Sequence, residues 1–309
     1  MCIKYLMILL TISITSCRDI PVDKGDLLGD DYRLFQGTPA WDLAKAVEDQ
    51  DVNEIKRQVQ LKNVPVDYKE ERWKQTLLML AVSTNKKKSV KTLLELGANP
   101  NEPSDSIRYR GDNPVIMASY LSGTSPSILK MLLEYGGNPN SVECGVQKDG
   151  HGNFIPARFF ALYEAVPLFE DFEKVRMLVE AGADVNMQTE TTGAGAMQHA
   201  IVLNRMDVLL YLLEHGADYN RKFKRIKVIS SANSASYVDF YVDILYELRL
   251  CVYPLNSKEY KDKLRVIEFL QKRGLDYWKS PLPDSAITII KRVIKPKSEE
   301  ELQEYIKKY

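Results

Sequence analysis

Residues suited to catalysis or metal binding are few and scattered in this chain of 309 residues. The three histidines and four cysteines do not have the spacing that a zinc site requires. The chain also lacks the Gly-x-Ser-x-Gly turn of serine hydrolases and a phosphate-binding glycine-rich loop that ends in Lys-Ser or Lys-Thr. His151 stands in DGHGN, which we interpret as a surface turn. The sequence therefore predicts no catalytic residue, metal, cofactor or small-molecule substrate, and it indicates a protein that is not an enzyme.

Aromatic and basic residues in long polar connections suggest binding instead. The connections cover residues 67–75, 101–112, 141–156 and 221–236, and each contains an aromatic residue. Aromatic residues and arginine are the types that most often dominate protein–protein binding. The alternative is that each ring folds back onto its own segment. The predicted partner-binding residues are Trp73, Arg108, Tyr109, Arg110, Phe154, Phe223, Lys224 and Arg225.

The segment RKFKRIK, residues 221–227, holds five basic residues in seven. It is consistent with a solvated hairpin, with contact to an acidic face of a partner, or with contact to anionic lipid headgroups, where each basic residue contributes about 1 kcal/mol. Lys and Arg together number 42, as do Asp and Glu, so no overall field attracts a polyanion. We therefore expect no nucleic-acid partner.

A repeated helical element must position these connections. Four segments share two apolar residues, a glycine and a final asparagine: LLELGANPN (93–101), LLEYGGNPN (132–140), LVEAGADVN (178–186) and LLEHGADYN (212–220). Around the first of them, the apolar spacing predicts a helix from about Thr76 to Ser83 and a second helix that buries Val90, Leu93 and Leu94. Gly97 then allows the left-handed conformation that closes a helix. One such helix pair cannot bury its apolar face alone, so we expect the pairs to stack.

This pattern resembles the ankyrin repeat. GAGAMQHA (193–200) and GDNPVIMA (111–118) are similar to the opening of that repeat, with the glycine and alanine in place. The resemblance implies an all-α fold class, a solenoid of about six degenerate repeats with long inter-repeat loops over residues 37–278. Residues 279–309 are expected to form a C-terminal helical cap, with a helix around Ala286–Val293 and another capped by Ser298 and Glu301.

The N-terminus predicts export. The apolar run Tyr5–Ile14 is too short for a membrane span, which needs about 20 residues, but it suits a signal peptide. The following ITSC (14–17) resembles the lipobox of bacterial lipoproteins, in which the cysteine is acylated, for example with palmitate. The resemblance implies a signal peptide over residues 1–16, lipidation of Cys17, and a tether over residues 17–36. A plain signal peptide or a buried apolar N-terminus is the alternative.

The lipobox resemblance implies a periplasmic protein held by a lipid anchor. Arg18, in place of an aspartate, favours the outer membrane. Initiation at Met7 would shorten the apolar run and leave a minor cytoplasmic pool. We expect Cys144 and Cys251 to remain separate thiols, although an oxidising periplasm would permit them to pair.

A lipid-anchored repeat protein without an enzyme motif is similar to bacterial ankyrin lipoproteins that act as immunity proteins. Such proteins are paired with type VI secretion effectors, notably phospholipases. The resemblance implies that this chain neutralises a cognate toxic lipase by steric occlusion. The alternative is a scaffolding or adaptor lipoprotein of an envelope complex.

Overall fold

The computed structural model describes residues 19–148, 152–168, 172–189, 193–231 and 234–309. The predicted signal peptide, Met7, Cys17 and His151 therefore lie outside the described residues. The chain divides into two compact units, the first ending at Ala98 and the second beginning at Asn99. Each unit is described by itself below. The boundary falls inside the region predicted to hold the repeats.

The first unit contains two pairs of helices, with short helical segments before the first pair and between the two pairs. Its elements are η2 (Lys24–Asp26), η3 (Tyr32–Phe35), α1 (Trp41–Asp49), α2 (Val52–Lys56), η4 (Arg57–Leu61), α3 (Leu77–Ser83) and α4 (Lys87–Glu95). The hydroxyl of Thr76 accepts the Met79 N–H and caps α3. Val90 and Leu93 on α4 are fully buried, and Gly97 has a φ of +91°. The helix pair predicted for this stretch is therefore confirmed.

Residues 19–36 are packed against this unit, although the sequence predicted a tether there. Leu34 and Phe35 have no exposed surface, because apolar residues spaced for a short helical turn face α1. The indole N–H of Trp41 and the ammonium of Lys45 both bind a carboxylate oxygen of Asp19, at 2.8 and 3.1 Å. The described part of the predicted tether is thus a folded element.

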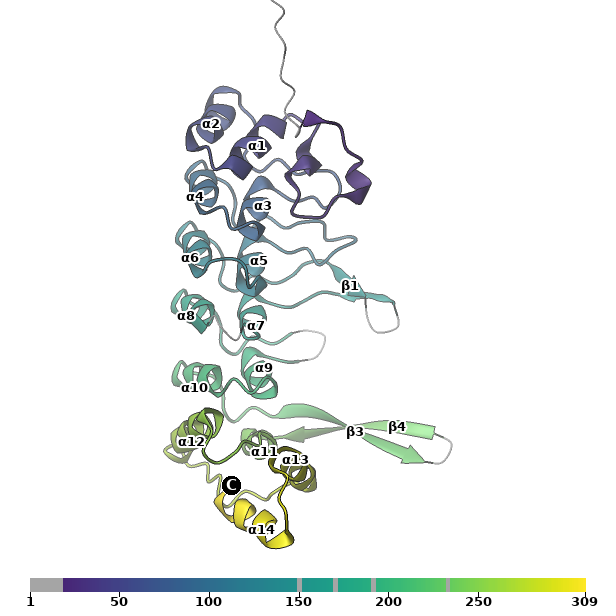
Figure 1. Cartoon of the computed structure of the whole chain (residues 1–309), viewed down its shortest axis with the longest axis vertical. Helices are drawn as coiled ribbons and strands as arrows, with labels where there is room; N and C mark the ends of the chain where they lie inside the picture. Colours follow the sequence, from purple (N-terminus) through teal and green to yellow (C-terminus); the bar gives the residue numbers. More distant parts are fainter. Residues whose placement is uncertain (1–18, 149–151, 169–171, 190–192, 232–233) are drawn as a thin grey trace, which may run out of the picture. The chain divides into compact units, whose positions relative to one another are not determined.

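The second unit begins with four consecutive pairs of helices. They are α5 (Pro114–Tyr120) with α6 (Pro126–Glu134), α7 (Ala161–Ala165) with α8 (Phe172–Glu180), α9 (Ala196–Val202) with α10 (Met206–Glu214), and α11 (Ile244–Leu250) with α12 (Lys258–Gln271). Within this unit, Figure 1 shows the first helices of the pairs in one row and the second helices in another. Contacts join α5 to α7, α7 to α9, α6 to α8 and α10 to α12. The stacking expected from the sequence is present in this unit.

Three of the four asparagines that end the repeated segments join one helix pair to the next. The Asn101 side chain donates to the Gly136 carbonyl at 2.9 Å and accepts the Asn138 N–H at 2.8 Å. Asn140 makes the same two bonds with Gly182 and Asp184. Asn186 makes them with Gly216 and Asp218. In these three junctions, the asparagine that ends one repeated segment binds the carbonyl of the glycine in the next segment.

Two antiparallel β-hairpins interrupt the helices, so the expected all-α class is corrected to a mostly helical fold with small sheets. One hairpin is formed by β1 (Val146–Lys148) and β2 (Phe154–Pro156). The other is formed by β3 (Phe223–Ser231) and β4 (Ser234–Val242), in a register that pairs Phe223 with Val242 and Ser231 with Ser234. The β-branched and aromatic residues of both long strands favour this conformation over a loop.

Two further helices, α13 (Asp284–Ile294) and α14 (Glu299–Lys308), end the chain. Ser298 caps α14 by accepting the Glu301 N–H, and the Glu301 carboxylate accepts the Lys297 N–H at 2.6 Å. α13 contacts α11, and the Tyr305 hydroxyl donates to the Tyr253 carbonyl at 2.6 Å. None of the helices in the described part of the chain combines the length and the apolar character that crossing a membrane requires.

Candidate functional site

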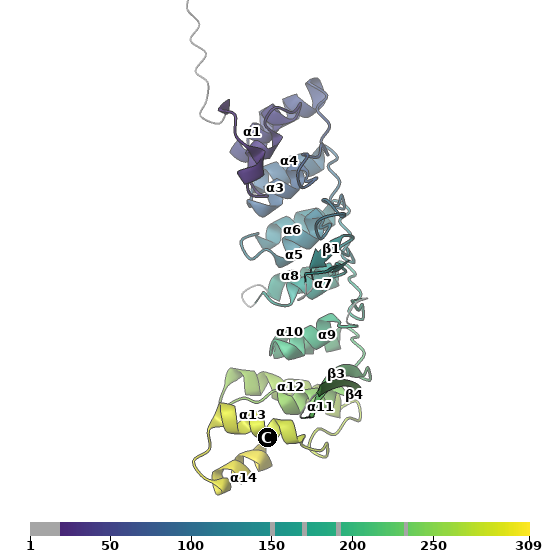
Figure 2. The ribbon, with the colours of Figure 1, turned by 90° about the vertical axis from the view of Figure 1, so that its right-hand side faces the viewer.

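The extended connections of the second unit carry large apolar side chains in contact with solvent. Figure 1 shows both hairpins projecting to the same side of the helix pairs of this unit, and Figure 2 shows their strands along one edge. Ile107 is 84% exposed, Phe154 62% and Tyr241 66%. Further exposed apolar residues on the connections are Tyr109, Val142, Ile226 and Val238. We call these connections the fingers: the first covers residues 101–112, the second residues 141–148 and 152–160, and the third residues 221–231 and 234–242.

The first two fingers are locked together by backbone contacts. The carbonyls of Tyr109 and Arg110 accept the N–H groups of Val146 and Gly145, at 2.9 and 2.8 Å. A Cβ atom on Gly145 would overlap the Tyr109 carbonyl oxygen, and one on Gly111 would lie 2.7 Å from the Cys144 sulfur. Only glycine permits this close crossing. The first two fingers therefore form one preformed surface.

Arg110 is held at this crossing by three carboxylates. Its guanidinium pairs directly with Glu143, with Glu164 at 2.7 Å and with Asp112 at 3.9 Å. Burial, only partly offset by the shared guanidinium, raises the pKa of Glu143 to about 7. Of the predicted binding residues, Arg110 thus fixes the fingers internally. Arg108 pairs with Asp105 at 3.0 Å while most of its side chain stays in solvent.

A row of stacked rings continues from this crossing along the first helices. The Phe159 and Tyr163 rings stack at 5.2 Å, and Tyr163 stacks on His199 at 4.0 Å. Burial lowers the pKa of His199, which favours the neutral imidazole. The sequence analysis did not select Phe159 or Tyr163. The closely spaced aromatics of FFALY (159–163), which runs into the start of α7, were the available signal.

The β3–β4 hairpin uses most of its described cations internally. Lys222 pairs with Asp243 at 3.6 Å and Lys224 with Asp239 at 2.7 Å. Arg225 pairs with the fully buried Glu247 of α11. Phe223 is only 3% exposed, so its ring is part of the interior, which was the alternative left open for each aromatic. The charge expected of RKFKRIK is therefore largely neutralised where the structure describes its side chains.

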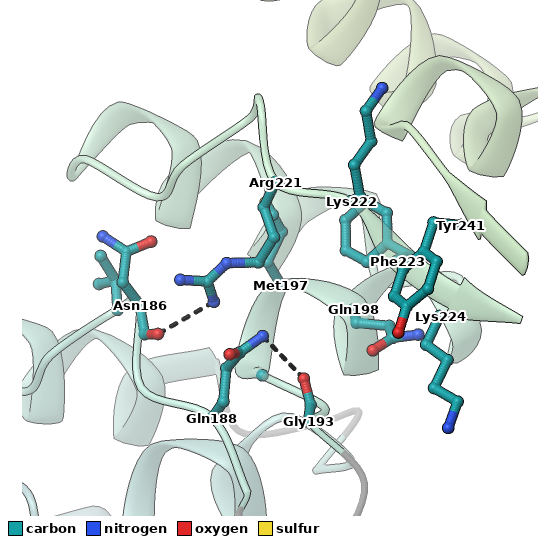
Figure 3. Close-up of a pocket in the computed structure, with 12 residues that line it drawn as sticks. Asn186, Gln188, Gly193, Met197, Gln198, Arg221, Lys222, Phe223, Lys224 and Tyr241 are labelled. Carbon is teal, nitrogen blue, oxygen red and sulfur yellow. Dashed lines mark hydrogen bonds between the residues drawn. The ribbon is translucent and has the colours of Figure 1, made fainter.

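Arg221 differs from its neighbours. Its guanidinium donates to the Asn186 carbonyl at 3.0 Å, and no carboxylate of the described residues lies within ion-pair distance. It lines a pocket of about 340 Å³. Figure 3 shows Arg221 and Gln188 on one side of the pocket and Gln198, Lys224 and Tyr241 on the other. Among the described residues that line it, the pocket combines cations and amide groups and holds no acidic side chain.

Trp73 belongs to the first unit and is half-buried there. The Arg72 guanidinium lies 4.3 Å from the centre of its ring. The buried Glu70 carboxylate accepts the N–H groups of Arg72, Trp73 and Gln75 and so shapes this turn.

The structure brings Arg108–Arg110 close to the second finger and places Phe223–Arg225 at the base of the long hairpin.

The described residues include two cysteines. Cys144 is exposed and Cys251 is buried, and both are free. The expectation of separate thiols is therefore confirmed. Burial raises the pKa of Cys251 to about 11, which keeps it protonated. Within the described ranges, no group of three or more His, Cys, Asp or Glu residues is placed to hold a metal ion.

Comparison with known proteins gives two findings. Residues 43–143 match the family model for ankyrin repeats in three copies. A stretch of 49 residues is 43% identical to the 2-5A-dependent ribonuclease of Homo sapiens, and it makes up 16% of this chain and 7% of that protein. The chain therefore spans only a small part of the length of this relative, and the ribonuclease activity in the name belongs to that protein.

Proposed function

This chain contains ankyrin repeats, and we propose that it binds one protein partner through the fingers of its second unit and neutralises that partner by covering its working surface. Ankyrin repeats are generally modules for protein–protein interaction rather than enzymes. We propose further that all the helix pairs are repeats of this kind, about six in all, and that α13 and α14 cap them.

The observation that carries the proposal is the exposed apolar surface of the locked fingers. Ile107, Tyr109 and Phe154 reach solvent from a backbone that the Gly145 crossing holds in place. A preformed surface loses little conformational freedom on binding, so more of its contact energy appears as affinity. Large apolar side chains on such a surface fit a protein partner better than a small molecule.

We propose a toxic lipase delivered by type VI secretion as the partner, in the periplasm, with Cys17 lipidated in the outer membrane. The lipobox sequence and the protein-binding fold support this proposal together. A lipid anchor would hold the inhibitor at the membrane that such a lipase attacks. The packing of residues 19–36 implies that the anchor would join the folded body almost directly, because Asp19 is already bound by Trp41 and Lys45.

Co-expression with a lipase encoded beside this gene tests the function. Periplasmic lipase alone is expected to stop growth, and this chain is expected to restore it by forming a complex that size-exclusion chromatography detects. Continued killing despite normal expression of both proteins contradicts the proposal. A stable complex without restored growth favours the scaffolding alternative.

Two sets of variants locate the binding surface. Ile107→Ala, Tyr109→Ala and Phe154→Ala combined should weaken the complex at least about tenfold. Tyr135→Ala and Val293→Ala combined are the control, because both side chains are 41% exposed but lie outside the fingers. Equal losses of affinity in the two sets would remove the fingers from the proposal.

The anchor is tested separately. Radiolabelled palmitate should label the wild-type chain and should not label Cys17→Ser. The wild type should sediment with outer membranes, while the variant should remain in the soluble periplasmic fraction. Labelling of Cys17→Ser, or equal sedimentation of both chains, would contradict lipidation at this residue.

A further inference from the structure

We infer that the pocket beside Arg221 is a socket for one carboxylate side chain of the bound protein, with the Arg221 guanidinium as its principal donor. The pocket lies between residues 185–189 and 193–198 on one side and the base of the β3–β4 hairpin on the other. The inference rests on the proposed function, because it names the chemistry of the partner at one part of the finger surface.

The distribution of ion pairs carries the argument. Lys222, Lys224 and Arg225 each have a carboxylate of the same chain within ion-pair distance. Within the described residues, the side chain of Arg221 has one acceptor, the Asn186 carbonyl, which is neutral. A guanidinium offers five N–H donors in a planar fork, so most of the donors of Arg221 remain available to a ligand. Among the described basic residues of the hairpin base, Arg221 is thus the one whose charge is not neutralised by a carboxylate of the described residues.

The surroundings of Arg221 suit a single carboxylate. Gly195 lines the pocket, and a Cβ atom there would lie 3.7 Å from a terminal nitrogen of Arg221, so the missing side chain leaves the guanidinium open to approach. Gln188 and Gln198 add amide groups to the lining. The volume of about 340 Å³ accommodates a side chain or two but not a helix. Arginine binds carboxylates through two parallel hydrogen bonds, which also fixes their orientation.

The same charges argue against a membrane surface as the occupant. Attraction to anionic lipid requires several unpaired basic residues acting together. Here three of the four described cations are paired within the chain. Exposed Tyr241 and buried Phe223 add ring surface to the lining, against which the methylene groups of a glutamate can pack. A glutamate on a protein loop matches these features best.

Arginine side-chain NMR of the full chain tests the socket without any knowledge of the partner. The probe is N-acetyl-glutamate amide, and its neutral match is N-acetyl-glutamine amide, both at constant ionic strength. The glutamate probe should shift the Nε signal of Arg221 saturably, with a dissociation constant in roughly the millimolar range. The glutamine probe should bind at least about tenfold more weakly. Equal effects of the two probes, or no saturable shift, would overturn the inference.

Variants identify the donor. Arg221→Lys keeps the charge but loses the fork, and it should weaken probe binding about tenfold when followed at the side-chain amides of Gln188 and Gln198. Lys272→Gln should change binding less than about twofold, because Lys272 does not line the pocket and its ammonium is already paired with Glu268 on the exposed surface of α12. Circular dichroism confirms that both variants are folded. An equal loss in both variants would indicate a general positive field and would overturn the socket.

Two further measurements separate this inference from its alternatives. Sedimentation with phosphatidylglycerol vesicles should be the same for wild type and Arg221→Gln, and loss of sedimentation in the variant would assign the pocket to lipid and overturn the inference. Lipase binding that is unchanged in Arg221→Lys would overturn the socket while the proposed function stands. Absence of lipase binding by the wild type, with the probe results intact, would overturn the proposed function alone.

Discussion

The two hairpins of the second unit solve the same structural problem in different ways. The β1–β2 hairpin has strands of three residues, and its base is bonded to the preceding finger at Tyr109 and Arg110. The β3–β4 hairpin has strands of nine residues, and its described base is joined to α11 through Arg225 and Glu247. The comparison teaches that a short finger obtains its order from a neighbour, whereas a long one depends on its own strand pairing and on its root.

The largest expected effect comes from breaking the crossing that holds the short hairpin. Gly145→Ala places a Cβ atom against the Tyr109 carbonyl, so we expect it to lower the free energy of unfolding by about 3 kcal/mol. Urea unfolding measures the change. The control is Gly123→Ala, because a Cβ atom at Gly123 meets no atom within 4 Å. If both variants unfold at the same urea concentration, the first two fingers are not locked together as described.

The second effect concerns the root of the long hairpin. Glu247→Gln leaves Arg225 without its buried partner and should lower the free energy of unfolding by about 2 kcal/mol. The loss is smaller than for breaking a fully buried ion pair, because the side chain of Arg225 is partly exposed to water. Hydrogen exchange should become faster in residues 223–226 and 238–242 but not in residues 146–148. Asp239→Asn, which breaks a surface pair, serves as the control and should cost less than about 0.5 kcal/mol. Faster exchange at both hairpins would show that their stabilities are coupled.

A third, smaller effect distinguishes the hairpins by pH. Because the pKa of Glu143 is raised from 4.5 to about 7, the folded chain holds a proton that the unfolded chain releases in this range. The contribution of Glu143 to stability should therefore decrease as the pH rises from about 4.5 to about 7 and then level off. Glu143→Gln should remove this part of the pH dependence in urea unfolding. An unchanged slope in the variant would place the titration elsewhere, with Glu164, whose pKa burial also raises, as the next group to test.

The smallest effect on stability is expected at the tip of the short hairpin. Phe154 is largely exposed, so Phe154→Ala should change the free energy of unfolding by less than about 0.5 kcal/mol. The same substitution should weaken binding of the proposed partner. Phe223 is buried at the base of the long hairpin, so Phe223→Ala should act mainly on stability and lower the free energy of unfolding by about 3 kcal/mol. Calorimetric unfolding of both variants checks this contrast.

Local patterns predicted the helix pairs well because their information lies close together in the sequence. Thr76, the apolar stripe of α4 and Gly97 fall within 22 residues and specify one helix pair almost alone. The same is true of Ser298 and Glu301 at α14. Short-range rules such as capping and periodicity require no knowledge of tertiary contacts.

The candidate site was predicted less well because the role of each of its residues depends on contacts with residues that are distant in the sequence. Arg110 is held by Glu143 and Glu164, which lie 33 and 54 residues further along the chain. Phe223 is buried, whereas Arg221 forms no ion pair with a described residue, yet the two stand only two positions apart in a segment that looked uniformly basic and exposed. Nor did composition show that residues 19–36 would pack, since that depends on Trp41 and Lys45.

The asparagine junctions have an evolutionary consequence. They join residues 35, 42 and 30 positions apart with the same two hydrogen bonds each time. The chain between one junction and the next can therefore gain or lose a dozen residues without changing how the helix pairs meet. Insertions and deletions in the fingers are expected to alter what the protein recognises while leaving the stack of helix pairs intact. Related chains can therefore adapt to a changed partner by varying the lengths of their fingers as well as by point substitution.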